Sequence, residues 1–402
     1  MANALDGIRV IDLTVWFQGP VAAQHLADFG AEVIKVERPQ GGDLARGVRS
    51  IKAVPVGDWN QYFLVINRNK KSMAVDLKEA GGREILHKLV KESDVFLSNL
   101  SPENLASWEL SYEELREINP RLVYAMNTGY GPFGEITKPS FDMTVQALTG
   151  LMARHGEPGQ PPIYLGMGSG DAIGGLMAAF GILLALQQRD VTGAGQYLDA
   201  SLYGAQLFLG APSLQGYLAG DRSLAQQRSR TEAPNPLWNT YEAGDRWLML
   251  CLENADESWS KLSGTLDDEA LAGDERFATE ARRSEHNAEL ISALDAAIAK
   301  HTADEWMERW QALDIPAAPV GNLEELANDP QAWENDYFVE TYCEEVQRDV
   351  NVRGLPVGLS KTPGEVRTLG PELGQHTEEI LTETLGYTWE QVVELKEQGA
   401  IL

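Results

Sequence analysis

The chain has 402 residues, of which 43% are hydrophobic and 23% charged, a composition typical of a globular, enzyme-sized protein with two domains. Its formal net charge of −27 argues against nucleic acid or an anionic membrane as a partner, because both carry negative charge. Two cysteines without metal-type spacing and six scattered histidines argue against a disulfide framework or a zinc site, so no metal is expected. Neither a secretory leader nor an uninterrupted membrane-length run is recognised, and the expected location is cytoplasmic.

The first half of the chain alternates between strand-like and helical segments. Residues 8–13 and 31–37 are short apolar strands, and residues 20–30 between them have helical spacing. Further strands are predicted at 72–77, 94–100 and 121–129, with helices at 81–93 and 111–120 and a long apolar helix from Asp171 to Gln188. This alternation predicts an α/β fold with a doubly wound, Rossmann-like parallel sheet. The GxGxxG fingerprint of dinucleotide-binding proteins is absent.

Changes in composition divide the chain into four parts. The sequence predicts a large α/β domain at 1–217, a polar and turn-rich linker at 218–236, a smaller α+β domain at 237–332, and a C-terminal segment at 333–402 that returns to the large domain. The small domain is expected to begin with a hairpin that turns at Gly244 and Asp245, followed by acidic amphipathic helices.

A glycine-rich turn with one carboxylate precedes the long apolar helix. Gly166, Gly168 and Gly170 permit positive φ angles and leave room for a ligand beside Asp171. An acidic residue at a helix start can simply cap the orphan amides of the first turn. In a turn open to a ligand, the same carboxylate can act as a nucleophile. The turn by itself leaves both roles open.

The N-terminal part of the chain is more basic than the rest. Residues 1–75 carry nine Lys and Arg against seven Asp and Glu, a balance of +2 within a chain of charge −27. A small anionic ligand would be attracted to such a segment. A solvated basic surface explains the same count equally well.

Seven segments spread over essentially the whole chain carry a family resemblance. They are DGIRVIDLT with LADFGAEVIKVERPQGGD, NRNKKSMAVDLK, INPRLVYAMNTGYG, FDMTVQALTGLM, GDAIGGLMAAFGILLAL with TGAGQYLDASL, IPAAPV, and PELGQHTEEIL. In this order they resemble the class III CoA-transferases, which include formyl-CoA, carnitine and benzylsuccinate CoA-transferases. The resemblance implies acyl-CoA and carboxylic acid substrates and no permanently bound cofactor. It also implies an interlocked dimer, either of identical chains or with a homologous subunit.

The resemblance gives the catalytic role to Asp171, which lies in the family's GDAIGG motif. It implies attack on an acyl-CoA thioester to form a mixed anhydride, and then an aspartyl-CoA thioester that the acceptor acid attacks. Arg38 is expected to bind phosphate oxygens through its guanidinium group. The CoA-binding residues implied by the same alignment are Arg38, Val75, Asp76, Leu77, Lys78, Asn99, Leu100 and Ser101. Lys70 and Lys71 could add charge near the phosphates or lie on a solvated face.

Three residues are expected to contact the substrate or shape its pocket. Phe17 and Gln18 occupy the region where family members often have a substrate-facing glutamine, displaced here by one position. Asp142 is expected either to orient the substrate or to cap the helix that begins there. It follows Phe141, where the related acyl-CoA racemases have a histidine base.

Two alternatives to an intermolecular CoA-transferase remain. A 2-methylacyl-CoA racemase is disfavoured by Phe141, because a phenyl ring cannot carry a proton. A CoA-binding subunit of a heteromeric transferase is disfavoured by Asp171, because an inactive partner does not need the nucleophile. Trp16, Phe17 and Trp238 suggest a larger apolar or aromatic acid as substrate, unless they belong to the core.

Overall fold

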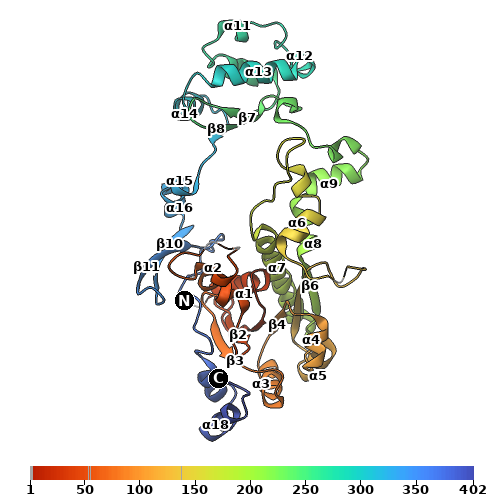
Figure 1. Ribbon diagram of the computed structural model, residues 1–402, viewed down its shortest axis with the longest axis vertical. Coiled ribbons are helices and arrows are strands. Elements are labelled where there is room, and N and C mark those ends of the chain that lie inside the picture. The colour runs from red at the N-terminus through yellow and green to blue at the C-terminus, as the bar shows by residue number, and fades with distance from the viewer. Residues whose placement is uncertain (1–2, 53, 55, 137) are drawn as a thin grey trace. The chain divides into compact units, whose positions relative to one another are not determined.

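The structure is a computed structural model that describes residues 3–52, 54, 56–136 and 138–402. The chain folds into two compact units, whose elements are labelled in Figure 1. The first unit contains the chain as far as Met152, together with Tyr164–Gln215 and Pro330–Leu402. The second contains Ala153–Ile163 and Gly216–Asp329.

A six-stranded parallel sheet forms the centre of the first unit. Its strands are β1 (Arg9–Leu13), β2 (Glu32–Glu37), β3 (Lys71–Ala74), β4 (Val95–Ser98), β5 (Val123–Thr128) and β6 (Tyr197–Ser201), in the order β3-β2-β1-β4-β5-β6. The segments VIDL and VFLS are buried along their whole length and mostly apolar, as expected for a parallel sheet covered by helices on both faces. The predicted doubly wound α/β fold is confirmed.

Helices cover both faces of this sheet. On one face α1 (Gln18–Asp28) and α7 (Ser169–Thr192) bury alanine and aliphatic side chains against the strands. The other face is covered by α3 (Ala80–Lys91), α4 (Pro102–Ser107), α5 (Tyr112–Ile118) and α18 (Trp389–Glu397). A Cβ on Gly175 of α7 would lie 2.6 Å from the carbonyl oxygen of Gln18. Glycine at this position therefore permits the close approach of α7 to α1.

Shorter elements connect the sheet helices. They are a 3₁₀ segment at Leu44–Ser50, α2 (Gln61–Ile66), α6 (Asp142–Leu148), a 3₁₀ turn at Met152–Arg154, α8 (Leu202–Leu209) and α9 (Ala211–Leu218). The C-terminal part of the first unit adds α16 (Pro330–Glu334), the hairpin β10 (Phe338–Cys343) and β11 (Arg348–Arg353), α17 (Thr377–Glu379) and a π-helical turn at Ile380–Thr384. A buried ion pair of 2.7 Å between Arg68 and Asp28 anchors this part, because Arg68 also donates to the Arg353 and Gly354 carbonyls.

The second unit consists of an antiparallel sheet packed against helices. The strands are β7 (Trp238–Glu242), β8 (Trp247–Cys251) and β9 (Ala317–Pro319), and the helices are α10 (Asp256–Ser263), α11 (Glu269–Ala272), α12 (Glu280–Glu285), α13 (Asn287–Ile298), α14 (Ala303–Gln311) and α15 (Leu323–Ala327). Its core includes the stacked rings of Trp306 and Trp310.

The boundaries of the second unit differ from the expected small domain at 237–332. Residues 218–236, assigned to a linker from their polar composition, are part of the second unit, as is the distant segment Ala153–Ile163. The physical reason is side-chain pairing that composition does not reveal. Arg230 binds both oxygens of Asp295 in α13, at 3.0 and 2.8 Å, and donates to the Thr240 carbonyl of β7.

Helix α7 is long and apolar enough to cross a membrane, judged by length and composition alone. In the fold it packs against α1, α8 and the strands β5 and β6, so one side of it belongs to the core of the first unit. Its other side exposes Leu176, Phe180, Leu183, Leu184 and Val191.

Candidate active site

A cavity of about 1210 Å³ lies at the carboxyl ends of β1, β4 and β5, within the first unit. Residues 15–18, 99–103 and 127–134 contribute to its walls, together with Asp142 and Asp171. This edge of a parallel sheet is where α/β proteins usually bind ligands. Sites for drug-sized ligands enclose roughly 300–1,000 Å³, so the cavity is large enough for a ligand of that size.

Asp171 lies in the first turn of α7, which begins after Gly168. Gly166 and Gly168 have φ angles of 99° and 81°, so the turn needs the left-handed conformation that glycine adopts without strain. The cap position of α7 is Gly168, and the Asp171 carboxylate accepts no hydrogen bond from any residue the structure describes. The Asp171 side chain therefore does not cap its own helix.

Asp142 takes over the capping of α7 from a neighbouring helix. Its buried carboxylate accepts hydrogen bonds from the amides of Gly168 at 2.7 Å and Gly170 at 3.1 Å. The amide groups of Gln206 and Gln146 donate to the same carboxylate at 2.8 and 3.1 Å. Asp142 was expected to orient the substrate or cap the helix at which it stands. In the structure this carboxylate holds the start of α7 rather than capping its own helix, and its contact with the substrate stays a prediction.

The two carboxylates have opposite surroundings. Burial, and then the negative charge of Asp142, raises the pKa of Asp171 to about 7. Asp142 has four donors within hydrogen-bond distance, whereas Asp171 has none among the described residues. Near neutral pH, Asp171 thus exchanges readily between a carboxylate and a carboxylic acid.

The loop between β1 and α1 forms the wall nearest to this helix start. The Asn99 side-chain amide binds both the amide and the carbonyl of Val15, at 2.9 and 2.7 Å. The amide of Trp16 donates to Asp43 at 3.1 Å, and Trp16 has a φ of 70°. Such a conformation costs a bulky residue about 1–3 kcal/mol, so surrounding contacts must hold it. Phe17 lies beside Gly168, where an added Cβ would be 3.6 Å from the ring.

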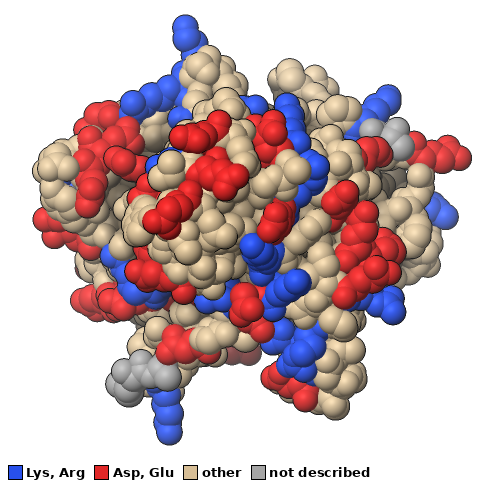
Figure 2. All heavy atoms as spheres, turned by 90° about the horizontal axis from the view of Figure 1, so that it is seen from below, with Lys and Arg blue, Asp and Glu red and all other residues tan. Residues whose placement is uncertain are grey.

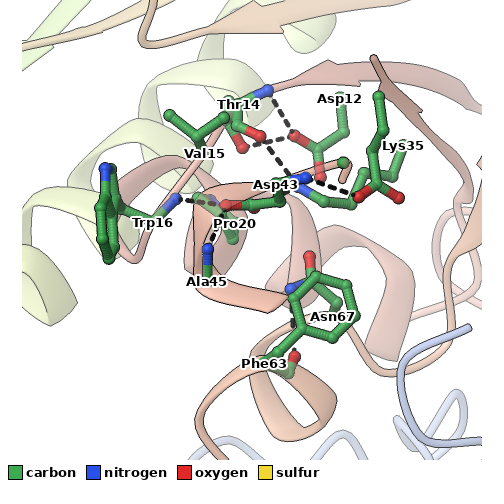
Figure 3. Close-up of polar contacts among 12 residues, drawn as sticks. Asp12, Thr14, Val15, Trp16, Pro20, Lys35, Asp43, Ala45, Phe63 and Asn67 are labelled. Carbon is green, nitrogen blue, oxygen red and sulfur yellow. Dashed lines mark hydrogen bonds and ion pairs between the residues drawn. The ribbon is translucent and has the colours of Figure 1, made fainter. Parts of the chain in front are cut away.

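Buried charged residues lie next to this loop, as Figure 3 shows. Lys35 forms a 2.9 Å ion pair with Asp43 and donates to the Thr14 carbonyl at 2.8 Å. Burial opposes the charge of Lys35, but the carboxylates of Asp43 and Asp12 outweigh it and raise the pKa of Lys35 to about 12. Lys70 binds Asp12 at 2.8 Å, and here burial prevails and lowers the pKa of Lys70 to about 8.

This buried network was not among the features predicted from the sequence. Lys70 was expected near the phosphates or on a solvated face, but its side chain is fully buried among Asp12, Asn67 and the Pro20 carbonyl. A signal was present, because Asp12 and Lys35 stand inside the apolar strand segments IRVIDL and AEVIKVE. Charged residues in a strand buried on both faces must be paired.

The cavity gathers six of the predicted CoA- and substrate-binding residues around Asp171, namely Phe17, Gln18, Asn99, Leu100, Ser101 and Asp142. The other five predicted positions, Arg38, Val75, Asp76, Leu77 and Lys78, are not among its lining. Val75 and Leu77 have buried side chains in the core. Arg38 and Lys78 are exposed just beyond the carboxyl ends of β2 and β3.

The basic balance of residues 1–75 is largely neutralised by pairing. Seven of the nine Lys and Arg form ion pairs, namely Arg9, Lys35, Arg46, Arg49, Arg68, Lys70 and Lys71. On the face shown in Figure 2, Lys and Arg side chains lie among Asp and Glu side chains. The charge count alone therefore does not locate an anion site.

Comparison with known proteins identifies the family of this chain. The family model described as CoA-transferase family III matches residues 5–377. The chain is 33% identical to succinyl-CoA–D-citramalate CoA-transferase of Chloroflexus aurantiacus over 99% of this chain and 98% of that protein. It is 31% identical to cinnamoyl-CoA:phenyllactate CoA-transferase of Clostridium sporogenes, over 100% and 98%. The crystal structure of a CaiB/BaiF family protein from Brucella suis superposes with a TM-score of 0.83 at 30% identity, covering 95% of this chain and 100% of that one. The chain belongs to the family III CoA-transferases and is an enzyme of that family.

Proposed function

We propose that this enzyme moves CoA from an acyl-CoA to a free carboxylic acid, with Asp171 as its covalent nucleophile. One observation carries the proposal: the Asp171 carboxylate lines the cavity and accepts no hydrogen bond from any described residue, so its oxygens are free to attack. Asp142 keeps the turn before it rigid. A pKa of about 7 leaves a substantial ionised fraction at neutral pH.

The reaction then proceeds through two kinds of intermediate on Asp171. The carboxylate attacks the thioester carbonyl and expels CoA thiolate, which gives a mixed anhydride. The thiolate attacks the Asp171 carbonyl, releases the donor acid and leaves an aspartyl-CoA thioester. The acceptor carboxylate attacks that thioester and expels CoA thiolate, which gives a second mixed anhydride between Asp171 and the acceptor. The thiolate then attacks the acceptor carbonyl of this anhydride. This last step releases the product acyl-CoA and regenerates Asp171.

For CoA itself we assign a path along the carboxyl edge of the sheet. Arg38 and Lys78 are exposed beyond β2 and β3, where they would meet the phosphates. Asn99, Leu100 and Ser101 line the cavity and would flank the thiol-bearing arm on its way to Asp171. In this proposal CoA esters bind as substrates and dissociate after transfer, so CoA is not a permanently bound cofactor.

The test of the proposal is mass spectrometry of the peptide that contains Asp171, after incubation with an acyl-CoA. We expect a CoA or acyl adduct on this peptide in the wild-type enzyme and none in Asp171→Asn, because an amide cannot form the anhydride. Asp190→Asn, an exposed position on the same helix, is the matched control and should label normally. Turnover of Asp171→Asn at a tenth of the wild-type rate, a loss of only about 1.4 kcal/mol, would overturn the assignment.

A 2-methylacyl-CoA racemase is the second candidate, and Phe141 argues against it. This ring packs edge-on against Trp16 with centroids 6.3 Å apart, and it offers no group that accepts a proton. In deuterated water the enzyme should transfer CoA without placing deuterium on the α-carbon. Deuterium incorporation at the rate of transfer would instead assign the chain to the racemases.

We also propose that the enzyme works as an assembly of two such chains, either identical or homologous. The outward side of α7 exposes Phe180, Leu184 and Val191, and Phe208 of α8 is 63% exposed. Monomeric proteins seldom expose apolar side chains in such a row, so a second chain is a natural cover.

The thiols of Cys251 and Cys343 are free, which suits a reducing cytoplasm.

A further inference from the structure

Four aromatic side chains form one wall of the cavity beside Asp171. Trp16 and Phe141 meet edge to face, and Phe17 and Tyr62 meet at a tilt with centroids 5.5 Å apart. Trp16 and Phe17 are adjacent in the chain, so the two pairs adjoin. Trp16, Phe17, Tyr62 and Phe141 are called the aromatic wall below, and all four line the cavity with Asp171.

The position of the aromatic wall is fixed from outside the cavity. The Asn99 side chain accepts a hydrogen bond from the Val15 amide and donates one to the Val15 carbonyl. The Trp16 amide donates to Asp43, which forms an ion pair with Lys35. These contacts hold Trp16 at its positive φ, which is an energetically unfavourable conformation. Phe17 lies against Gly168, three residues before Asp171. The wall is therefore held in place next to the nucleophile.

Two polar side chains near this wall, Gln18 and Asn99, are engaged within the fold, whereas the uncharged amide of Asn127 in the same lining has no hydrogen-bond partner among the described residues. The Gln18 amide donates to the Ala200 carbonyl at 3.1 Å, and the Asn99 amide is used on Val15. Among the described residues that line the cavity, Lys138 is the single Lys or Arg, and it is exposed in the segment before Phe141. Four acidic residues, Glu103, Glu113, Asp142 and Asp171, already lie in the lining. A further carboxylate on an acyl chain would meet like charge rather than a partner.

From this arrangement we infer that the enzyme selects acyl groups with an uncharged, aromatic or branched apolar side chain, and discriminates against dicarboxylic acids. The inference rests on the proposed function of Asp171. The names of the two transferases above include a dicarboxylic acid, D-citramalate, and an aromatic acid, phenyllactate. Sequence similarity alone therefore does not identify the substrate class. The aromatic wall and the scarcity of cations favour the apolar class.

The test compares kcat/KM for 3-phenylpropanoyl-CoA and 4-methylpentanoyl-CoA with that for succinyl-CoA and glutaryl-CoA, using one common acceptor acid. We expect at least a tenfold preference for the apolar donors. Phe141→Ala, a change at a 56% exposed ring, should reduce that preference at least threefold, while Trp389→Ala on α18, outside the cavity, should leave it unchanged. Equal or better use of succinyl-CoA would overturn the inference, as would a loss confined to dicarboxylic donors in Lys138→Ala.

A binding measurement separates this inference from the proposed mechanism. Titration calorimetry of the same four acyl-CoAs with Asp171→Asn does not depend on the nucleophile. We expect the two apolar esters to bind Asp171→Asn more tightly than the two dicarboxylic esters do. Equal affinities, or tighter binding of the dicarboxylic esters, would overturn the inference. Turnover that persists in Asp171→Asn would overturn the proposed mechanism and leave the substrate preference intact.

Discussion

The amide of Gly168 and the carboxylate of Asp142 are joined by a 2.7 Å hydrogen bond that spans 26 residues of the chain. This bond and its neighbour from Gly170 hold the first turn of α7. A Cβ on Gly170 would lie 2.3 Å from the Asp142 carboxylate, so the turn cannot accept alanine without displacing it. Asp142 thus anchors the turn, and its negative charge also raises the pKa of Asp171.

The rate of CoA transfer should rise with pH through about 7. Asp171 attacks as a carboxylate, and its raised pKa means that it is protonated and inactive below that pH. Asp142→Asn should move the midpoint of kcat/KM to lower pH, because it removes the neighbouring charge. It should also lower the free energy of unfolding by about 1–3 kcal/mol, because the amide donates where the turn needs an acceptor. A wild-type midpoint near 4 would contradict this prediction.

Asp171→Asn should stabilise the fold while abolishing activity. In the unfolded chain the pKa of Asp171 is near 3.8, whereas burial and Asp142 raise it to about 7 in the fold. The folded state therefore loses stability as pH rises from about 4 to 7, and the variant should gain about 2–4 kcal/mol at pH 8 and little at pH 4. Urea unfolding at both pH values measures this difference. A gain that is the same at pH 4 and pH 8 would exclude ionisation as its cause.

Two adjacent lysines should differ sharply in their effect on stability. Lys70→Met leaves the Asp12 carboxylate buried without its cation, which costs about 3–5 kcal/mol. Lys71→Met removes half-exposed pairs with Glu32 and Glu379, each worth about 0–1 kcal/mol. Denaturant midpoints of the two variants provide the comparison. Similar losses in both would show that Lys70 does not serve the buried network.

Arg38→Ala should weaken binding of acyl-CoA more than it slows the chemical step. Loss of one charge-assisted phosphate contact costs about 1.5–3 kcal/mol, so KM should rise roughly 10- to 150-fold with kcat nearly unchanged. Arg49→Ala, whose exposed side chain pairs with Glu345, is the control and should leave KM unaltered. Kinetics at two salt concentrations would reveal the lost charge. An unaltered KM in Arg38→Ala would place the phosphates elsewhere.

Phe180→Glu should break the proposed assembly of two chains. The side chain is 56% exposed on the outward face of α7, and a buried, unpaired carboxylate there would oppose association. Light scattering coupled to size exclusion should report a dimer for the wild-type protein and a monomer for the variant. Val393→Glu on α18 is the control, since Val393 is similarly exposed at 52%. A monomeric wild-type protein at micromolar concentration would refute the proposal.

The sequence by itself determined the parallel α/β fold, the family and the glycine turn around Asp171. These features are local, because strand and helix periodicity and the positive φ of Gly166 and Gly168 are encoded within short segments. The long helix was likewise predicted from Asp171 to Gln188, within the observed Ser169–Thr192.

Tertiary structure decided the features that depend on pairing between distant segments. Lys70 meets Asp12 across 58 residues and Asn99 meets Val15 across 84, and only the order of β3, β2, β1 and β4 brings these residues together. The same reason places Ala153–Ile163 in the second unit. A charge count treats Lys35 and Lys70 as available to a ligand, whereas burial in a low-dielectric core requires each to have a partner of its own.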